Sequence, residues 1–222
     1  MGEIILPSER PDPPAEIRTS ALKVLFSALP VVGPVLSELL FDCRSRIKQE
    51  RVLLTLREAT RDLEETKIDF EFLKSDECGD LLEDILQKVA VNNSEAKRAY
   101  FKNLLTKVIH GHPAPDLSRT FINILGEITE SELLLLSQFY KIRAQGIQLQ
   151  KEGKEVDLYV YCTKEKEEIF GIFRSQYLLL VQSLIRKGLL CDDSGGRFDS
   201  SPYDVVGINE LGVQFYEHIS HA

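Results

Sequence analysis

Residues 187–208 read KGLLCDDSGGRFDSSPYDVVGI, and this stretch decides the fold class of the chain. Two short runs rich in Leu, Val and Ile, at 189–190 and 203–208, flank a segment of Asp, Ser and Gly. Apolar runs bounded by such turn-forming residues are typical of the strands of a hairpin. The stretch therefore predicts a two-stranded element in a chain whose other segments repeat with the period of a helix.

Helices are predicted on both sides of this hairpin. The segment 165–186 places apolar side chains on one helical face, and Asn209 can cap a closing helix that runs to about Ser220. The apolar face of the first of these helices consists of Ile169, Phe173, Tyr177, Leu180 and Leu184. The hairpin is therefore expected to lie between two helices, with strands confined almost entirely to 187–208.

A further pair of helices is predicted upstream. A short one can start at Asp116, and a second one opens at Thr129 and Glu132, which have the spacing of a capping box. The apolar run 133–136 follows and is predicted to be buried. Residues 144–156 are polar and are predicted to form a connector.

The order helix, Lys-Gly-Leu-Leu, hairpin, strand, and a last helix with Leu-Gly in its first turn resembles the winged-helix fold over roughly residues 117–221. The resemblance implies a winged-helix-like C-terminal domain with a small β-hairpin. Winged helices bind DNA in some proteins and other proteins in others, so the fold leaves the function open.

The first half of the chain is patterned as helices only. Val52, Leu56 and Ala59 recur at helical spacing, and they predict a long amphipathic helix that continues toward Lys67. Further amphipathic segments follow, one of which Ser94 can cap, and together they predict a mainly α protein with a helical bundle in its N-terminal half. The expected organisation is a flexible Pro-rich tail (1–16), the helical bundle (17–110), a linker (111–115) and the winged-helix-like domain (116–222).

Residues 21–41, ALKVLFSALPVVGPVLSELLF, carry two charges and a Pro-Val-Val-Gly-Pro break. A membrane span needs about twenty apolar residues, and each arm of this segment has about ten. We expect the segment to be buried in the bundle and to reach a membrane only after a conformational change. The candidate contacts with a membrane or partner are Leu25, Leu29, Val32, Leu36 and Leu40, with the basic residues Arg44, Arg46, Lys48 and Arg51.

The stretches ALPVVGPVLSELLFDCRSRIKQERV (28–52) and EAKRAYFKNLL (95–105) resemble an uncharacterised group of bacterial proteins. Members begin with an apolar Pro-x-x-Gly helix pair, continue as a helical bundle and end in a winged-helix-like region. The resemblance implies an association with antiphage defence, and it supplies no catalytic residues.

Charge argues against nucleic acid as the partner. The net charge is −8, and residues 151–222 hold eight basic and twelve acidic side chains, which repel a phosphate backbone. Residues 41–67 hold seven basic and six acidic side chains, which favours a salt-bridged helix face over a phosphate site. The candidate DNA contacts are nevertheless Gln182, Ser183, Arg186 and Lys187 on the predicted helix and Arg197 in the wing.

Catalytic and metal-binding motifs are not found. The pairs His110/His112 and His218/His221 lack the third and fourth ligands that a zinc site needs. Four scattered cysteines without a Cys-x-x-Cys pattern indicate reduced thiols and a cytoplasmic protein. We therefore expect no enzymatic activity, no metal and no cofactor.

The sequence favours a non-enzymatic interaction or adaptor protein, an accessory or sensor in a bacterial defence or stress system, with a protein partner or self-association. Two alternatives stay open. One is a winged-helix transcriptional regulator that binds DNA, and the other is a membrane-active helical bundle that uses residues 21–41.

Overall fold

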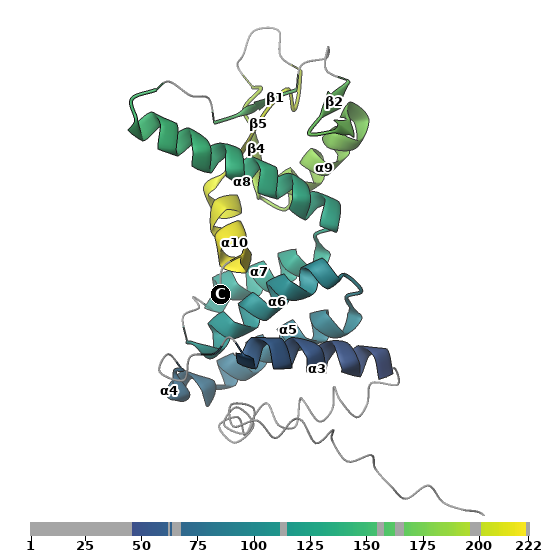
Figure 1. The fold of residues 1–222 in the computed structure, drawn as a ribbon, viewed down its shortest axis with the longest axis vertical. Helices are drawn as coiled ribbons and strands as arrows, with labels where there is room; N and C mark the ends of the chain where they lie inside the picture. The colour runs from purple at the N-terminus through teal and green to yellow at the C-terminus, as the bar shows by residue number, and fades with distance from the viewer. Residues whose placement is uncertain are drawn as a thin grey trace, which may run out of the picture.

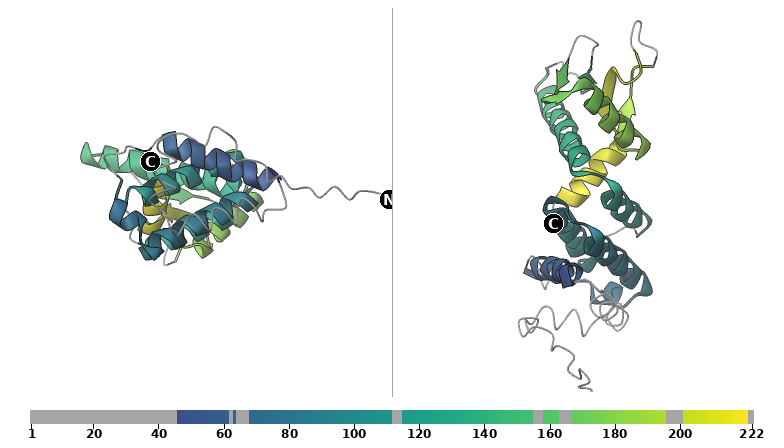
Figure 2. Two further views of the ribbon diagram at one scale, coloured as in Figure 1. Left: turned by 90° about the horizontal axis from the view of Figure 1, so that it is seen from below. Right: turned by 90° about the vertical axis from the view of Figure 1, so that its right-hand side faces the viewer.

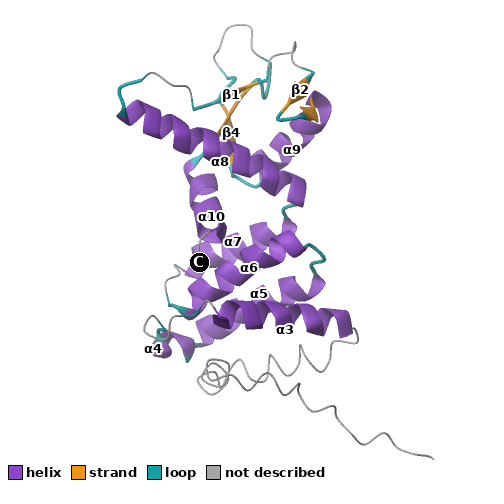
Figure 3. Ribbon diagram, in the orientation of Figure 1, coloured by secondary structure: helices purple, strands orange, loops and turns teal. Residues whose placement is uncertain are grey.

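A computed structural model of the chain describes residues 46–61, 63, 68–111, 115–154, 158–162, 167–195 and 201–220. These residues form eight helices, α3 to α10, and five short strands. Figure 3 shows the strands gathered in the C-terminal part of an otherwise helical molecule. The expected mainly α fold with a small sheet in the C-terminal part is thus confirmed.

The first five of the described helices form a bundle at the lower end of the described part of the molecule (Figure 1). They are α3 (Arg46–Arg61), α4 (Phe70–Leu73), α5 (Asp76–Val91), α6 (Glu95–Ile109) and α7 (Pro115–Glu127). α3, α5 and α6 pack against one another, and α7 packs on α5 and α6. No strand occurs among the described residues of this half, as the sequence predicts.

An apolar stripe on α3 and serine caps on α5 and α6 position these helices. The predicted stripe Val52, Leu56 and Ala59 is buried, so α3 turns its apolar face toward α5 and α6. Serine hydroxyls cap α5 and α6: Ser75 accepts from the Cys78 amide, and Ser94 accepts from the Lys97 amide. The cap at Ser94 is the one that the sequence predicts.

The second half combines three helices with all the described strands. They are α8 (Glu130–Lys151), β1 (Val160–Tyr161), β2 (Glu168–Ile169), β3 (Ile172–Phe173), α9 (Arg174–Arg186), β4 (Leu190–Asp192), β5 (Val205–Ile208) and α10 (Glu210–Ser220). β1, β5 and β4 form an antiparallel sheet in that order, with Cys191 opposite Gly207. β2 and β3 form a separate hairpin that leads directly into α9.

The predicted strands and the closing helix are confirmed, and other predictions are wrong. The apolar run 133–136 is not buried throughout, because Leu134 is 67% exposed on the outer side of α8. Strands are not confined to 187–208, because β1, β2 and β3 precede it. The helix predicted over 165–186 begins only at Arg174, because 168–173 form the β2–β3 hairpin. The polar segment 144–156 is not a connector over most of its length, since α8 continues through it to Lys151.

The last helix joins the two halves. α10 packs on both α6 and α8, and it lies between the lower bundle and the upper elements in Figure 2. The Asn103 amide donates to the carbonyl of Ile219 at 2.8 Å, and the Lys107 ammonium donates to the carbonyl of His218 at 2.6 Å. These two donors satisfy carbonyls that a helix end leaves unpaired.

Several predictions concern residues outside the described ranges. The apolar segment 21–41 is one of them, and the tail and part of the linker 111–115 are others. The linker prediction is untested, although α7, assigned from sequence to the C-terminal domain, packs on α5 and α6. Among the described helices, none combines the length and the apolar character needed to cross a bilayer.

Gly212 allows α10 to approach the chain before β4. A Cβ atom at this position would overlap the backbone carbonyl oxygen of Leu189, which cannot move without shifting the β4 strand. Gly212→Ala should therefore lower the free energy of unfolding by about 2–3 kcal/mol, the upper range for overpacked sites. Urea unfolding followed by circular dichroism measures this, with Gly195→Ala as the control because no atom of the described residues lies within 4 Å of its added methyl group. Equal stability of the two variants would contradict the packing described.

His218 should make the stability depend on pH. Burial, followed by the nearby Lys107 ammonium, lowers the pKa of His218 to about 4, and its ring packs on Phe121. The unfolded chain binds this proton near pH 6.5, so His218 contributes stability above pH 6.5 that is lost between pH 6.5 and 4. Urea midpoints across this range should fall less steeply in His218→Gln than in the parent protein. Identical slopes would exclude His218 as the titrating group.

Candidate interaction surface

Most of the candidate DNA contacts predicted from the sequence lie on or next to α9. One face of this helix is buried by packing against the rest of the fold. Tyr177, Val181 and Leu184, spaced at i, i+4 and i+7, are buried. They lie where α9 packs against α8 and β4. Burial of three such side chains stabilises the position of α9 by several kilocalories per mole, at about 1.5–3 kcal/mol each for Val and Leu. The opposite face of α9 is consequently held outward.

The β2–β3 hairpin sets the start of α9. Its two-residue turn has positive φ angles at both positions, 55° at Phe170 and 74° at Gly171, as in a type I′ turn. Glycine adopts this conformation readily, but an aromatic residue does so at a cost in free energy. The Phe170 ring packs edge-on against Phe139 at 5.9 Å and lies 6.3 Å from Tyr177, and these contacts offset the cost.

The outward face of α9 carries a continuous row of exposed residues, here called the α9 stripe: Ser175, Leu179, Gln182 and Arg186. Their spacing of i, i+4, i+7 and i+11 places them on one side of the helix over about 16 Å. Leu179 is 62% exposed, a large apolar side chain in the middle of a polar row. Phe173, at the N-cap of the same helix, is 68% exposed.

The basic side chains of α9 differ in whether they are free to bind a partner. Arg174 pairs with Asp204 at 3.3 Å, and Lys187, the C-cap residue, pairs with Glu132 at 2.9 Å. Arg186 is exposed and forms no ion pair with any residue that the structure describes. The α9 stripe therefore offers a single cation to a partner, and the helix itself contains no acidic side chain.

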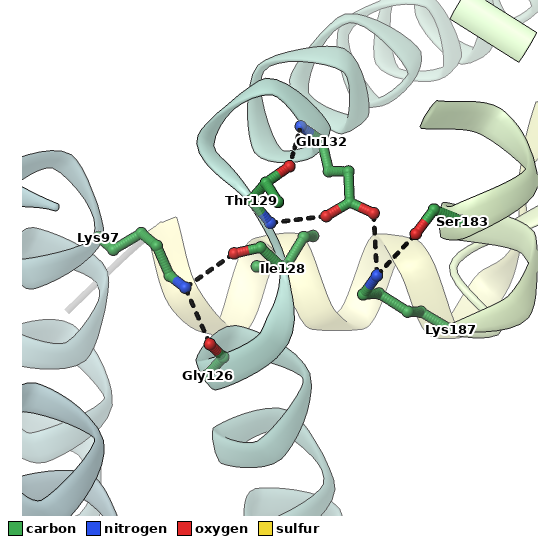
Figure 4. Close-up of polar contacts among 7 residues, drawn as sticks. All are labelled: Lys97, Gly126, Ile128, Thr129, Glu132, Ser183 and Lys187. Atoms are coloured by element: carbon green, nitrogen blue, oxygen red, sulfur yellow. Dashed lines mark hydrogen bonds and ion pairs between the residues drawn. The ribbon is translucent and has the colours of Figure 1, made fainter. Parts of the chain in front are cut away.

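Figure 4 shows the polar network that holds the C-terminal end of α9. The Glu132 carboxylate is 3% exposed and accepts from the Thr129 amide at 2.6 Å, which completes the predicted capping box. The same carboxylate accepts from the Lys187 ammonium, which also donates to the Ser183 hydroxyl at 2.8 Å. α8 and α9 are thereby joined through a carboxylate that is almost fully buried.

A buried lysine, Lys97, lies on the other side of the α7–α8 turn (Figure 4). The Lys97 ammonium, on α6, donates to the carbonyls of Gly126 at 3.1 Å and Ile128 at 2.7 Å. Both carbonyls lie at the C-terminal end of α7, where the helix dipole favours a positive charge. The turn is thus held from the bundle by Lys97 and from α9 by Lys187 through Glu132.

The network sets the protonation of its members. Burial lowers the pKa of Lys97, although the nearby Glu132 and Glu130 carboxylates act in the opposite direction. Burial opposes ionisation of Glu132, but hydrogen bonds from Ser183, Thr129 and Lys187 outweigh it and lower the pKa of its carboxyl group. Glu132 is therefore a carboxylate at neutral pH, as its pairing with Lys187 requires.

The structure separates the predicted contact residues into distinct groups. Gln182 and Arg186 are exposed on the α9 stripe, whereas Ser183 and Lys187 belong to the network around Glu132. Arg197 lies outside the described residues, as do Leu25, Leu29, Val32, Leu36, Leu40 and Arg44.

The remaining basic candidates lie far from α9. Arg46 and Lys48 are exposed on α3, and Arg51 donates to the carbonyl of Ala90 at 3.4 Å. α3 and α9 are at opposite ends of the molecule in Figure 1, so the two predicted contact regions do not form one site.

None of the described histidine and cysteine residues belongs to the α9 stripe. His110 is the C-cap of α6 and His218 lies on α10, while His112 and His221 fall outside the described residues. Within the described ranges no group of three potential metal ligands occurs. The described cysteines Cys78, Cys162 and Cys191 form no disulfide with one another, and burial raises the pKa of Cys78 to about 12.

No protein-family model, no curated protein and no solved structure matches the chain. The resemblance of residues 28–52 and 95–105 to a bacterial group therefore stays a prediction.

Glu132 should contribute strongly to stability. Glu132→Gln keeps an acceptor for the Thr129 amide but removes the charge that pairs with Lys187. The free energy of unfolding should fall by about 1.5–3 kcal/mol, the range for hydrogen bonds to charged groups. The matched control is Glu130→Gln, an exposed residue in the same helical turn, with a loss below about 1 kcal/mol.

A double variant separates the ion pair from other effects of the substitution. Glu132→Gln with Lys187→Met should lose clearly less stability than the sum of the two single losses, because each single variant leaves a buried or partly buried charge without its partner. Chemical denaturation of the four proteins gives the coupling energy. Additive losses would show that Glu132 and Lys187 do not stabilise each other.

Proposed function

We propose that this chain is a non-enzymatic interaction protein whose C-terminal half is a winged-helix-like module that binds a protein partner through the α9 stripe. Three features of the second half support a winged-helix-like arrangement. α8 precedes β1, α9 runs directly into the β4–β5 hairpin, and β1 pairs with β5 to give the strand order β1-β5-β4. α9 then takes the place of the helix with which such modules meet their partners.

The composition of the α9 stripe is the observation that carries the proposal. Protein interfaces are poor in charge at their centre and rich in large apolar side chains. Leu179 occupies the middle of the stripe, Ser175 and Gln182 flank it with neutral polar groups, and Arg186 lies at its end. This arrangement of an exposed apolar centre with a polar rim favours a protein as the partner.

DNA binding is the second candidate, and the availability of the cations argues against it. Binding to duplex DNA depends on several Lys or Arg side chains that neutralise phosphates. Ion pairs engage Arg174 and Lys187, which leaves Arg186 as the available cation among the described residues of α9. Serine, glutamine and arginine do read base edges in the major groove, and this is the feature that keeps DNA as an alternative.

The resemblance to a bacterial group extends the proposal to its biological setting. It supports an accessory or sensor role in a defence or stress system, with the α9 stripe as the contact to another component. A membrane role would involve residues 21–41, which lie outside the described ranges.

Site-specific photocrosslinking tests the proposal. A photoreactive phenylalanine at position 179, introduced in cells that encode the protein, should give a discrete adduct with another protein. The same residue at position 91 should not, although Val91 is as exposed as Leu179, at 65% and 62%. Ser175→Arg, one turn away on the stripe, should abolish the adduct at 179. Equal crosslinking at both positions, or an adduct unaffected by Ser175→Arg, would contradict the proposal.

A salt series tests the DNA alternative. Fluorescence anisotropy of a random-sequence duplex should show weak binding at about 0.15 M salt, and Arg186→Ala should change it little. A protein that neutralises several phosphates would lose about 10³-fold or more in affinity between 50 and 200 mM salt. Such a steep loss, together with sensitivity to Arg186→Ala, would replace the protein partner with DNA.

A further inference from the structure

We infer that the α9 stripe docks an acidic amphipathic helix of the partner protein. The inference rests on the proposed function and adds the chemistry of the partner. Two observations carry it: the shape of the stripe and the distribution of charge along α9.

The shape of the stripe favours a helix. Ser175, Leu179, Gln182 and Arg186 form a straight ridge over three helical turns, which is the pattern that a second helix meets by ridges-into-grooves packing. The backbone of α9 is hydrogen-bonded within the helix, so the surface offers no free edge to which a strand could add. An apolar side chain at the centre of the incoming helix would cover Leu179.

The charge along α9 favours an acidic helix. The chain has a net charge of −8, yet the α9 sequence RSQYLLLVQSLIR contains no carboxylate. Arg186 is the cation of this face that no described carboxylate pairs with. An acidic partner is therefore repelled by most of the molecule and attracted by this face, which gives both steering and specificity.

The surroundings of α9 also set the orientation of the partner. The exposed carboxylates of Glu167 and Glu168 precede β3, so they lie at the N-terminal end of α9. Arg186 lies at the C-terminal end. The acidic end of the incoming helix should consequently lie over Arg186 and away from β2.

A display selection with designed peptides tests the chemistry of the partner directly. The probe is a library of amphipathic helical peptides with an apolar centre and randomised flanking charges, selected against the full chain. Peptides whose binding requires Leu179, as shown by loss with Leu179→Asp, should be enriched in Asp and Glu at one end.

Charge reversal then identifies the contact. Arg186→Glu should weaken a selected acidic peptide by about tenfold or more, and a peptide with Lys in place of the acidic residue should restore binding to this variant. Lys141→Glu is the matched control, because Lys141 is exposed on α8 and its reversal changes the net charge equally. Arg186 makes no described ion pair, so its variant should unfold at the same urea concentration as the parent.

The possible outcomes distinguish a failure of the acidic helix from a failure of the proposed protein interaction. Leu179-dependent peptides without an acidic excess, or equal effects of Arg186→Glu and Lys141→Glu, would overturn the acidic helix and leave the proposed protein interaction intact. A selection that yields no Leu179-dependent peptide would overturn the inference. If the protein also bound duplex DNA with a steep dependence on salt, the proposed function would fail as well.

Discussion

The carboxylate of Glu132 is the group on which the arrangement of the two halves most depends. It is almost completely buried, and a buried charge is tolerated only with good partners. Its partners are the Thr129 amide at the start of α8 and the Lys187 ammonium at the end of α9. On the other side of the same turn, Lys97 donates to the carbonyls of Gly126, in the last turn of α7, and of Ile128, just beyond it. α6, α7, α8 and α9 are thereby joined at one point.

The network around Glu132 explains why neighbouring basic residues at the end of α9 have different roles. Lys187 turns inward to Glu132, and Arg186, one residue earlier, points to the exposed side. Arg174, at the other end, is held by Asp204. The fold therefore uses two of three cations to fix α9 in place and leaves the third on the outer face. A rigid helix with one available charge loses little conformational entropy on binding, which favours specific recognition.

Features that depend on residues close together in the sequence are predicted well, whereas contacts between residues far apart in the chain are not. The capping box at Thr129 and the cap at Ser94 depend on residues close in sequence, and both are confirmed. The pairing of Glu132 with Lys187 spans 55 residues, and no periodicity indicates it. The β2–β3 hairpin escapes prediction because Ile169, Phe173 and Tyr177 also have helical spacing. The glycine at position 171 is the residue in the sequence that argues against a continuous helix. Its φ of 74° in the structure is a conformation that glycine adopts readily.

The same limit applies to the candidate contact residues. Helical spacing places Gln182 and Arg186 on a common face correctly, but it cannot show that Ser183 and Lys187 belong to an internal network. α8 gives the converse case, because its last turns contain few apolar side chains and still form a helix through Ala, Gln and Lys, which have high helix propensity. Burial patterns therefore predict which helices pack, whereas the availability of a charged side chain depends on partners from distant elements. The exposed face of α9 is defined by what those partners leave unpaired.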